Sequence, residues 1–176
     1  PIVPVCALSG EGLDELKLAL NDVLGATLPP ADRGKPRLFV DRVFSPRGAG
    51  TVVTGTLTGG VLRTGDSVIV QPAGLRGKIR GLQNHNRSME SVRPGMRTAI
   101  QISGVDAARD GASSGVRRGD VIEAGPLLSP GASQVIHVWL ERPPIEGGSA
   151  KTPQVKHGQR VWFHHGTAGT EARLYL

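Results

Sequence analysis

Two patterns of apolar and polar positions divide the chain near residue 36. Before it, an apolar run at 2–7 predicts the end of a buried strand, and apolar residues at helical spacing predict a helix over 13–24. Gly25 is a natural stop, because glycine is common just past the end of a helix. The stretch 26–36 holds two adjacent prolines and several charges, which predicts an interdomain linker.

From residue 37 onward the pattern is that of many short strands. Val, Ile and Thr are enriched in short runs that Gly, Pro or Asp separate. Strands at this density favour closed barrels, which leave no exposed strand edge. A break at 126–131 predicts two successive barrels, of which the second is incomplete. The expected strands are 37–44, 50–57, 66–71, 75–82, 97–103, 120–123, 134–140, 159–165 and 171–176.

These patterns predict four segments along the chain. Residues 1–25 are expected to be the end of an α/β domain, 26–36 the linker, 37–126 the first barrel, and 127–176 the start of the second. The first residue is proline rather than methionine, so we expect a fragment that begins inside a domain. A short motif predicts barrel corners. In it, an apolar residue and a basic residue come before a turn glycine. It recurs at 62–65, 92–95, 116–119 and 155–158.

The composition of the chain excludes several classes of function. No apolar run approaches the roughly 20 residues of a membrane-spanning helix, so no membrane partner is expected. The single cysteine, Cys6, excludes a disulfide framework. Residues 1–36 carry a formal charge of −2, whereas 37–176 carry +8, mostly through arginine. Arginine pairs with phosphate through its planar fork, which suggests a polyanionic partner, but an arginine-rich genome would give the same balance.

Few residues suggest catalysis or metal binding. The glycine-rich loop 45–51 precedes a strand rather than a helix, which predicts a hairpin turn instead of a phosphate-binding loop. His164 and His165 are neighbours that face opposite sides of a strand, and no Cys or acid stands at ligand spacing. We therefore expect no metal site and no catalytic residue in this chain.

Two opposite charges in the middle of an apolar strand need an explanation. Residues 37–44 read RLFVDRVF, with Asp41 and Arg42 at the centre. One explanation is a structural ion pair with a neighbour, and the other is a charged pocket for a small ligand. In a regular strand the two side chains face opposite ways, so a shared pocket requires a bend or a bulge.

The order of these motifs resembles a known family. RLFVDRVF at 37–44, GAGTVVTGT at 48–56 and GDSVIV at 65–70 look like the opening of the second domain of translational GTPases related to elongation factor Tu. PVCALSGEGLDEL at 4–16 is similar to the last guanine-contacting loop and final helix of their GTPase domain. The resemblance implies that Cys6, Ala7 and Leu8 are what remains of that loop, with Cys6 in place of the usual serine.

Within that superfamily the details resemble the selenocysteine-specific (SelB) family. Asp-Arg at 41–42 stands where elongation factor Tu carries two acids. LQNHN at 82–86, GMRTA at 95–99, RGD at 118–120 and VWFHHGTA at 161–168 match the selenocysteine-specific type as well.

The resemblance implies a pocket for the selenocysteinyl group, formed by Asp41, Arg42 and Arg97. A selenol is largely ionised at neutral pH, whereas the serine carried by the same tRNA before conversion is neutral. Guanidinium groups would therefore favour the selenolate through charge-assisted hydrogen bonds. Asp41 is expected to orient the amino-acid end or an arginine. Weaker candidates near the aminoacyl end are Phe44, Thr54 and His85.

By this resemblance the chain is a fragment of a cytoplasmic, GTP-dependent factor that delivers selenocysteinyl-tRNA to the ribosome. The intact protein would be a GTPase that uses GTP and Mg²⁺ and recognises an mRNA hairpin through a C-terminal region. The fragment lacks the catalytic GTPase motifs and is expected to need no cofactor. Two alternatives stay open. One is a general elongation factor Tu-like GTPase for ordinary aminoacyl-tRNA, and the other is a β-barrel interaction module without an RNA ligand.

Overall fold

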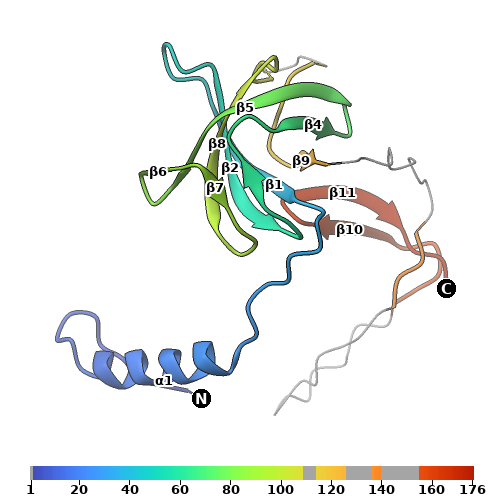
Figure 1. Ribbon diagram of the computed structural model, residues 1–176. Helices are drawn as coiled ribbons and strands as arrows, with labels where there is room; N and C mark the ends of the chain where they lie inside the picture. The colour runs from blue at the N-terminus through green and yellow to red at the C-terminus, as the bar shows by residue number, and fades with distance from the viewer. Residues whose placement is uncertain (1, 109–113, 126–135, 140–154) are drawn as a thin grey trace. The chain divides into compact units, whose positions relative to one another are not determined.

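The computed structural model describes residues 2–108, 114–125, 136–139 and 155–176 (Figure 1). The chain forms two compact units, which divide between Ala31 and Asp32. The division falls inside the stretch that the sequence indicated as a linker. The expected boundary between two barrels at residue 126 adjoins 126–135, which lies outside the described residues, and it stays a prediction.

The first unit contains a single helix in its described part. Helix α1 spans Leu13–Ala26, so the helix that the apolar spacing predicted is confirmed and runs slightly past Gly25. Gly12 caps its start with a φ of 76°, and a Cβ there would lie 2.2 Å from the carbonyl oxygen of Pro4. Glycine is needed at this position because only it combines a positive φ with such close backbone approach.

The strand expected at 2–7 is wrong, because the structure shows no strand over these residues. A strand needs a neighbouring strand to pair its backbone groups. Here the N–H of Cys6 donates to the carbonyl of Glu11, and the carbonyl of Cys6 accepts from Gly10. The backbone is thus satisfied within a local loop, and Val5 is left 46% exposed.

The second unit is built on a closed β-barrel. Its sheet has the order β4-β9-β1-β2-β8-β5-β6, and β4 also pairs with β5, which closes six of the strands into a ring. The strands are β1 Arg37–Phe44, β2 Thr51–Thr58, β3 Leu62–Arg63, β4 Ser67–Gln71, β5 Leu75–Asn84, β6 Arg87–Met89, β7 Ser91–Val92, β8 Arg97–Ser103, β9 Val121–Ala124, β10 Arg160–His165 and β11 Ala168–Arg173.

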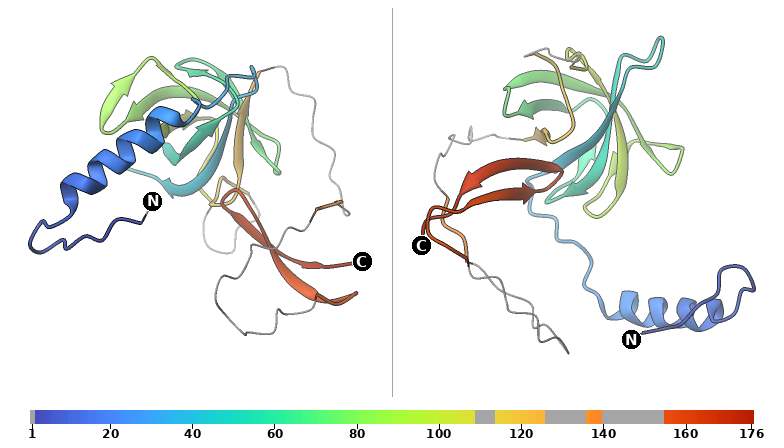
Figure 2. Two further views of the ribbon diagram at one scale, coloured as in Figure 1. Left: turned by 90° about the horizontal axis from the view of Figure 1, so that it is seen from below. Right: turned by 180° about the vertical axis from the view of Figure 1, so that it is seen from behind.

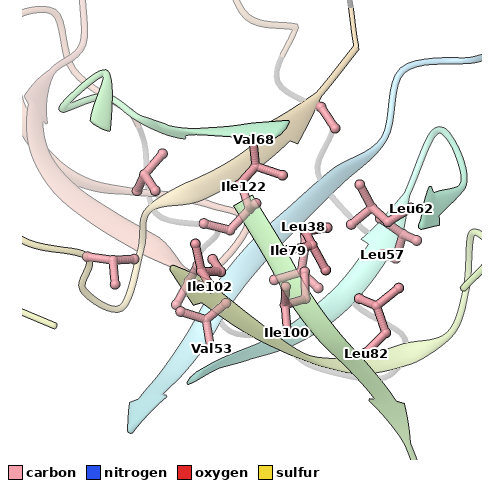
Figure 3. Packing of buried hydrophobic residues seen from close by; sticks show 14 of the residues in the cluster. Leu38, Val53, Leu57, Leu62, Val68, Ile79, Leu82, Ile100, Ile102 and Ile122 are labelled. Atoms are coloured by element: carbon pink, nitrogen blue, oxygen red, sulfur yellow. The ribbon is translucent and has the colours of Figure 1, made fainter. Parts of the chain in front are cut away.

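Alternate side chains of these strands fill the interior of the barrel. On β2, for example, Val53 and Leu57 are buried while Thr54 faces outward. This alternation is the period of two that a half-buried strand produces. Figure 3 shows inward side chains from several strands meeting at one centre. The core comprises Leu38, Val40, Val53, Leu57, Leu62, Val68, Val70, Ile79, Leu82, Val92, Ile100, Ile102, Val105, Val116, Ile122 and Ala124.

The recurrent motif of a basic residue and a turn glycine forms four turns of the same geometry. In each, the backbone N–H of the fourth residue donates to the carbonyl of the first. The side chain of that fourth residue accepts from the N–H of the first. The glycine has a positive φ, as the third residue of a type II turn requires. The turns are Arg63–Asp66, Arg93–Met96, Arg117–Asp120 and Lys156–Gln159, with glycine φ values of 93°, 88°, 96° and 75°.

Replacing Asp120 by Asn is expected to make the free energy of unfolding less dependent on pH. Burial raises the pKa of this carboxyl, against the lowering effect of the Arg117 N–H bond. Its stabilising contribution is therefore complete below the ordinary carboxyl pKa of about 4 and is lost as pH rises through the higher folded value. Asp120→Asn keeps an oxygen acceptor and should have a higher melting temperature than the unmodified chain at neutral pH. Asp120→Ala should have a lower melting temperature than the unmodified chain at every pH, because it removes the acceptor. If the melting temperatures of Asp120→Asn and of the unmodified chain depend on pH in the same way, the prediction is wrong.

The last described segment is a hairpin of β10 and β11, which pair antiparallel from Arg160 opposite Arg173 to His165 opposite Ala168. It lies beside β1 (Figure 2), where the Thr167 hydroxyl donates to the Val40 carbonyl at 2.6 Å. The strand expected at 171–176 instead runs from Ala168 to Arg173. The strand expected at 134–140 falls mostly outside the described residues, and 136–139 carry no strand.

Candidate functional site

A β-bulge in β1 brings two charged side chains to the outer face of the barrel. Cross-strand pairing shifts between Val40, opposite Gly55, and Arg42, opposite Thr54. Asp41 is therefore the extra residue of the bulge. Thr54 faces outward, so Arg42 opposite it faces outward too, and Asp41 accepts a hydrogen bond from Thr54 on that same side. The bulge thus satisfies the condition under which these two charges share a site.

Asp41 forms a bidentate ion pair with Arg97, the first residue of β8. Both terminal nitrogens of Arg97 donate to the carboxylate, with 2.9 Å between Nη2 and Oδ1. The Thr54 hydroxyl donates to the same Oδ1 at 2.7 Å. The hydrogen bonds from Arg97 are the main reason that the pKa of Asp41 lies below its ordinary value, and Asp41 in turn raises the pKa of Arg97. The structural ion pair that the sequence offered as one explanation is therefore present.

Acidification is expected to break this pair. Because the folded-state pKa of Asp41 is depressed, the pair stabilises the fold above the ordinary carboxyl pKa of about 4. Its contribution is lost as pH falls through the lower folded value. An NMR titration of the Asp41 carboxyl carbon should show a depressed midpoint, which Arg97→Gln moves upward. The exposed control Arg93→Gln should leave it in place; an unmoved midpoint in Arg97→Gln would contradict the assignment.

Arg42 gives the cluster its excess positive charge. Its side chain is exposed, and among the described residues it has no recorded hydrogen bond or ion pair. It still lies near enough to Asp41 to lower the pKa of that carboxyl through space. One carboxylate and two guanidinium groups leave a net charge of +1, and Arg42 is the cation whose donors are not directed at Asp41.

The turn between β5 and β6 lies against the same cluster. The side-chain amide of Asn84 donates to the Arg97 carbonyl at 2.6 Å, and Nδ1 of His85 lies 2.9 Å from the Asn84 side-chain oxygen. His85 and Asn86 have φ values of 48° and 61°, the left-handed conformation of a two-residue hairpin turn. Such backbone is uncommon in residues other than glycine and gathers at functional sites.

A cavity of about 530 Å³ adjoins the cluster on the outer face. Its lining includes Val52, Gln83 and Ala99 from three neighbouring strands. Ala99 is opposite Thr54 and stands two residues after Arg97 on the same face of β8. The cavity therefore begins where the charged cluster ends.

The remaining sequence candidates are Phe44 on β1 and three residues of the first unit. Phe44 is 44% exposed on β1, opposite Val52, and no ring contact or hydrogen bond is recorded between Phe44 and the cluster within the described residues. Cys6, Ala7 and Leu8 belong to the exposed loop of the first unit. Hydrogen bonds from Ser9 lower the pKa of the Cys6 thiol.

Sequence reasoning did not assign a role to Asn84 or Gly55. Asn84 lies within the LQNHN motif, but its bond to the Arg97 backbone joins positions far apart in the chain. Gly55 lies opposite the bulge, and a Cβ there would meet the Phe39 carbonyl oxygen at 2.2 Å. The available signal was its place in the GAGTVVTGT motif.

The described residues contain neither a cluster of metal-ligating side chains nor a membrane-spanning helix. No group of three or more His, Cys, Asp or Glu side chains in that part of the chain is arranged to hold a metal ion. No helix found there is long and apolar enough to cross a bilayer.

Comparison with known proteins identifies the class of this barrel. No family model matches the chain. The selenocysteine-specific elongation factor of Desulfomicrobium baculatum is 38% identical over 177 residues, which cover 100% of this chain and 26% of that protein. Elongation factor 1-alpha of Aeropyrum pernix is 36% identical over 140 residues, 74% of this chain and 30% of that protein. The crystal structure of translation elongation factor SelB from Methanococcus maripaludis, apo form, matches with a TM-score of 0.62 and 32% identity over 69% of this chain and 26% of that one.

The barrel is thus that of a translation elongation factor. The chain belongs to the elongation factor family, and its resemblance to the selenocysteine-specific SelB branch is confirmed by identity along its full length. It spans about a quarter of the length of that curated relative and of the SelB structure.

Proposed function

We propose that this chain is the aminoacyl-binding part of a GTP-dependent elongation factor that delivers selenocysteinyl-tRNA to the ribosome. The observation that carries the proposal is the bulge in β1, because it brings Asp41 and Arg42 to one outer face, where Asp41 pairs with Arg97. The intact protein would bind GTP and Mg²⁺ and recognise an mRNA hairpin through a further region. Cys6, Ala7 and Leu8 would approach guanine in that protein.

The chemistry of the cluster suits a selenolate better than a hydroxyl. A selenocysteinyl group is anionic at neutral pH, so Arg42 can donate a charge-assisted hydrogen bond to it. Such bonds contribute about 1.5–3 kcal/mol, against about 0.5–1.5 kcal/mol between neutral groups. The Asp41–Arg97 pair supports this discrimination by holding the second guanidinium in place and by limiting the net charge.

The neighbouring cavity offers room for the nucleotide that carries the amino acid. An aminoacyl group is esterified to the terminal ribose of its tRNA, so the terminal nucleotide must lie within a few bonds of the bound side chain. The 530 Å³ cavity is lined by Ala99, which lies opposite Thr54, and has both apolar and polar lining residues, among them Val52 and Gln83. We place the terminal nucleotide there, with His85 and Phe44 at the edges of the aminoacyl site.

Equilibrium binding of selenocysteinyl-tRNA and seryl-tRNA tests the proposal. The chain should be joined to a complete GTPase domain and assayed with GTP, using the same tRNA body in both forms. A preference of at least about tenfold for the selenocysteinyl form is expected from the difference in hydrogen-bond strength. Equal affinity for both forms would contradict the selenocysteine-specific role and favour a general aminoacyl-tRNA carrier. Failure to bind either form would favour an interaction module without an RNA ligand.

A general elongation factor is the second candidate, because the chain is also similar to elongation factor 1-alpha at 36% identity. The excess positive charge at Arg42 argues against it, since an ordinary aminoacyl group offers no anion at this position. Equal affinity for several aminoacyl-tRNAs whose amino-acid side chains are neutral would favour this candidate.

A further inference from the structure

The outer face of β5 carries three cations at successive outward positions. Ile79 and Leu82 are buried in the core, whereas Arg76 and Lys78 face outward and are exposed. Pairing with β8 shifts between Ile79 and Gly81, so Arg80 is the extra residue of a second bulge and is exposed as well. We call Arg76, Lys78 and Arg80 the β5 basic row; β5 is the long green strand of Figure 1.

Hydroxyl groups flank the β5 basic row on both sides. Lys78 stands between Ser67 on β4 and Ser103 on β8 in the cross-strand register. Nε of Arg80 donates to the Ser103 hydroxyl at 2.8 Å, which directs its guanidinium toward the residue opposite Lys78 rather than into solvent. Within the described residues, no ion pair is recorded for any of the three cations.

The nearest acids on the adjoining strands are already bound elsewhere. Glu123 stands two strands away from Arg76, across Ile69, but its side chain is 6% exposed and accepts from Arg37 at 2.8 Å. The Asp66 carboxylate accepts from the backbone N–H of Arg63. Neither of these two acids forms an ion pair with the row.

A cavity of about 610 Å³ opens over this part of the barrel. Arg76 and Lys78 line it together with Ser67, Ser103 and the side-chain-free glycines 77, 104 and 125. Glycine lining allows a bulky anion to approach close to the backbone. The Ser103 hydroxyl already donates to the Lys78 carbonyl at 3.4 Å, so the hydroxyl that can donate to a ligand is that of Ser67. The cavity thus combines cations, a hydroxyl donor and open space, as a phosphate group requires.

We propose that the β5 basic row and Ser67 bind phosphate groups of an RNA backbone, with Ser103 holding Arg80 in place. Alternate residues of a strand are about 6.7 Å apart, a spacing close to that of successive phosphates along a nucleic-acid strand. From Ser103 back to Arg97 on β8 the distance is about 20 Å, so the end of the row that holds Arg76 and Lys78 is separate from the aminoacyl cluster. Arg80, at the other end, also lines the 530 Å³ cavity. This contact with RNA goes beyond the proposed function, because it does not depend on which amino acid the tRNA carries.

Salt-dependent RNA binding by the full chain tests this inference. The variants are Arg76→Gln/Lys78→Gln and the control Arg93→Gln/Arg118→Gln, which makes the same charge change at exposed turns. The probes are deacylated tRNA and isolated small ribosomal subunits. The β5 variant should bind about tenfold more weakly near physiological salt, with a salt slope reduced by about two, one per phosphate contact. The control should change affinity by less than about twofold, and Lys78→Arg should retain binding.

The possible results distinguish tRNA from ribosomal RNA as the ligand, and a true phosphate contact from nonspecific binding. Loss with tRNA alone or with the ribosomal subunit alone supports the inference and identifies the RNA. Equal weakening by the β5 variant and its control would overturn it, since binding would then follow overall charge. So would unchanged affinity in the β5 variant, no RNA binding by the unmodified chain, or binding of inorganic phosphate alone. Matching melting temperatures of all variants exclude misfolding as the cause.

Discussion

Replacing Arg42 by Gln is expected to abolish the preference for selenocysteinyl-tRNA over seryl-tRNA. The exposed guanidinium of Arg42 is not engaged with Asp41, whereas Arg97 directs both terminal nitrogens to it. Loss of one charge-assisted hydrogen bond weakens selenolate binding by about 10-fold to 100-fold and leaves the seryl form nearly unaffected. The measurement is equilibrium binding of both forms to the factor that contains the chain.

Variants of the ion pair provide the control for this prediction. Arg97→Gln leaves Asp41 as an acid without its main partner beside the ligand, so it should weaken selenolate binding at least as strongly. Asp41→Asn/Arg97→Gln restores the net charge of +1 and should recover much of the preference. If the double variant stays as weak as Arg97→Gln, Arg97 contacts the selenolate itself and is not only a positioning residue.

Replacing Gly55 by Ala is expected to destabilise the barrel and disrupt the charged cluster together. A Cβ at Gly55 would lie 2.2 Å from the Phe39 carbonyl oxygen and 2.7 Å from Cδ2 of Leu38. Backbone atoms of a paired strand cannot move away without breaking the pairing that forms the bulge. We expect a loss of about 3 kcal/mol or more, which is a fall of about 10 °C in melting temperature for a unit of this size.

Gly81→Ala, on β5 of the same barrel, is the matched control. Its added Cβ would lie 3.2 Å from the side-chain oxygen of Gln101 and would approach no backbone atom within 4 Å. A shift of a few tenths of an ångström in the Gln101 side chain, which donates to the Ala49 carbonyl, would relieve this contact. A loss below about 1 kcal/mol is expected. If Gly55→Ala and Gly81→Ala have the same melting temperature, the close approach of Gly55 to β1 does not constrain the bulge.

The local pattern predicted most of the barrel because burial alternates along its strands. The limits of 37–44 and 97–103 agree with β1 and β8, where inward Val, Ile or Leu alternates with outward residues between glycine-rich turns. The same reasoning failed at 2–7. An apolar run forms a strand only where a partner strand lies beside it, and local sequence carries no information about the partner.

The candidate site was predictable in part. The charges at 41 and 42 cannot share a face of a regular strand, and this conflict within the sequence itself indicated a bend or a bulge. Arg97 came only from resemblance, since nothing in the residues near Asp41 points to a partner on β8. Asn84 was missed for the same reason, because its bond is to a backbone carbonyl of that distant strand.

The four repeated turns have a consequence for the order in which the barrel folds. Each turn is closed by bonds between residues three positions apart, so it can form on the timescale of local loop closure. The ring closes only when β1 meets β9 across most of the second unit, with Arg37 opposite Glu123. Such remote pairing forms slowly. We therefore expect the meeting of β1 and β9 to limit the rate of folding, with the three turns that lie between them in the chain formed earlier.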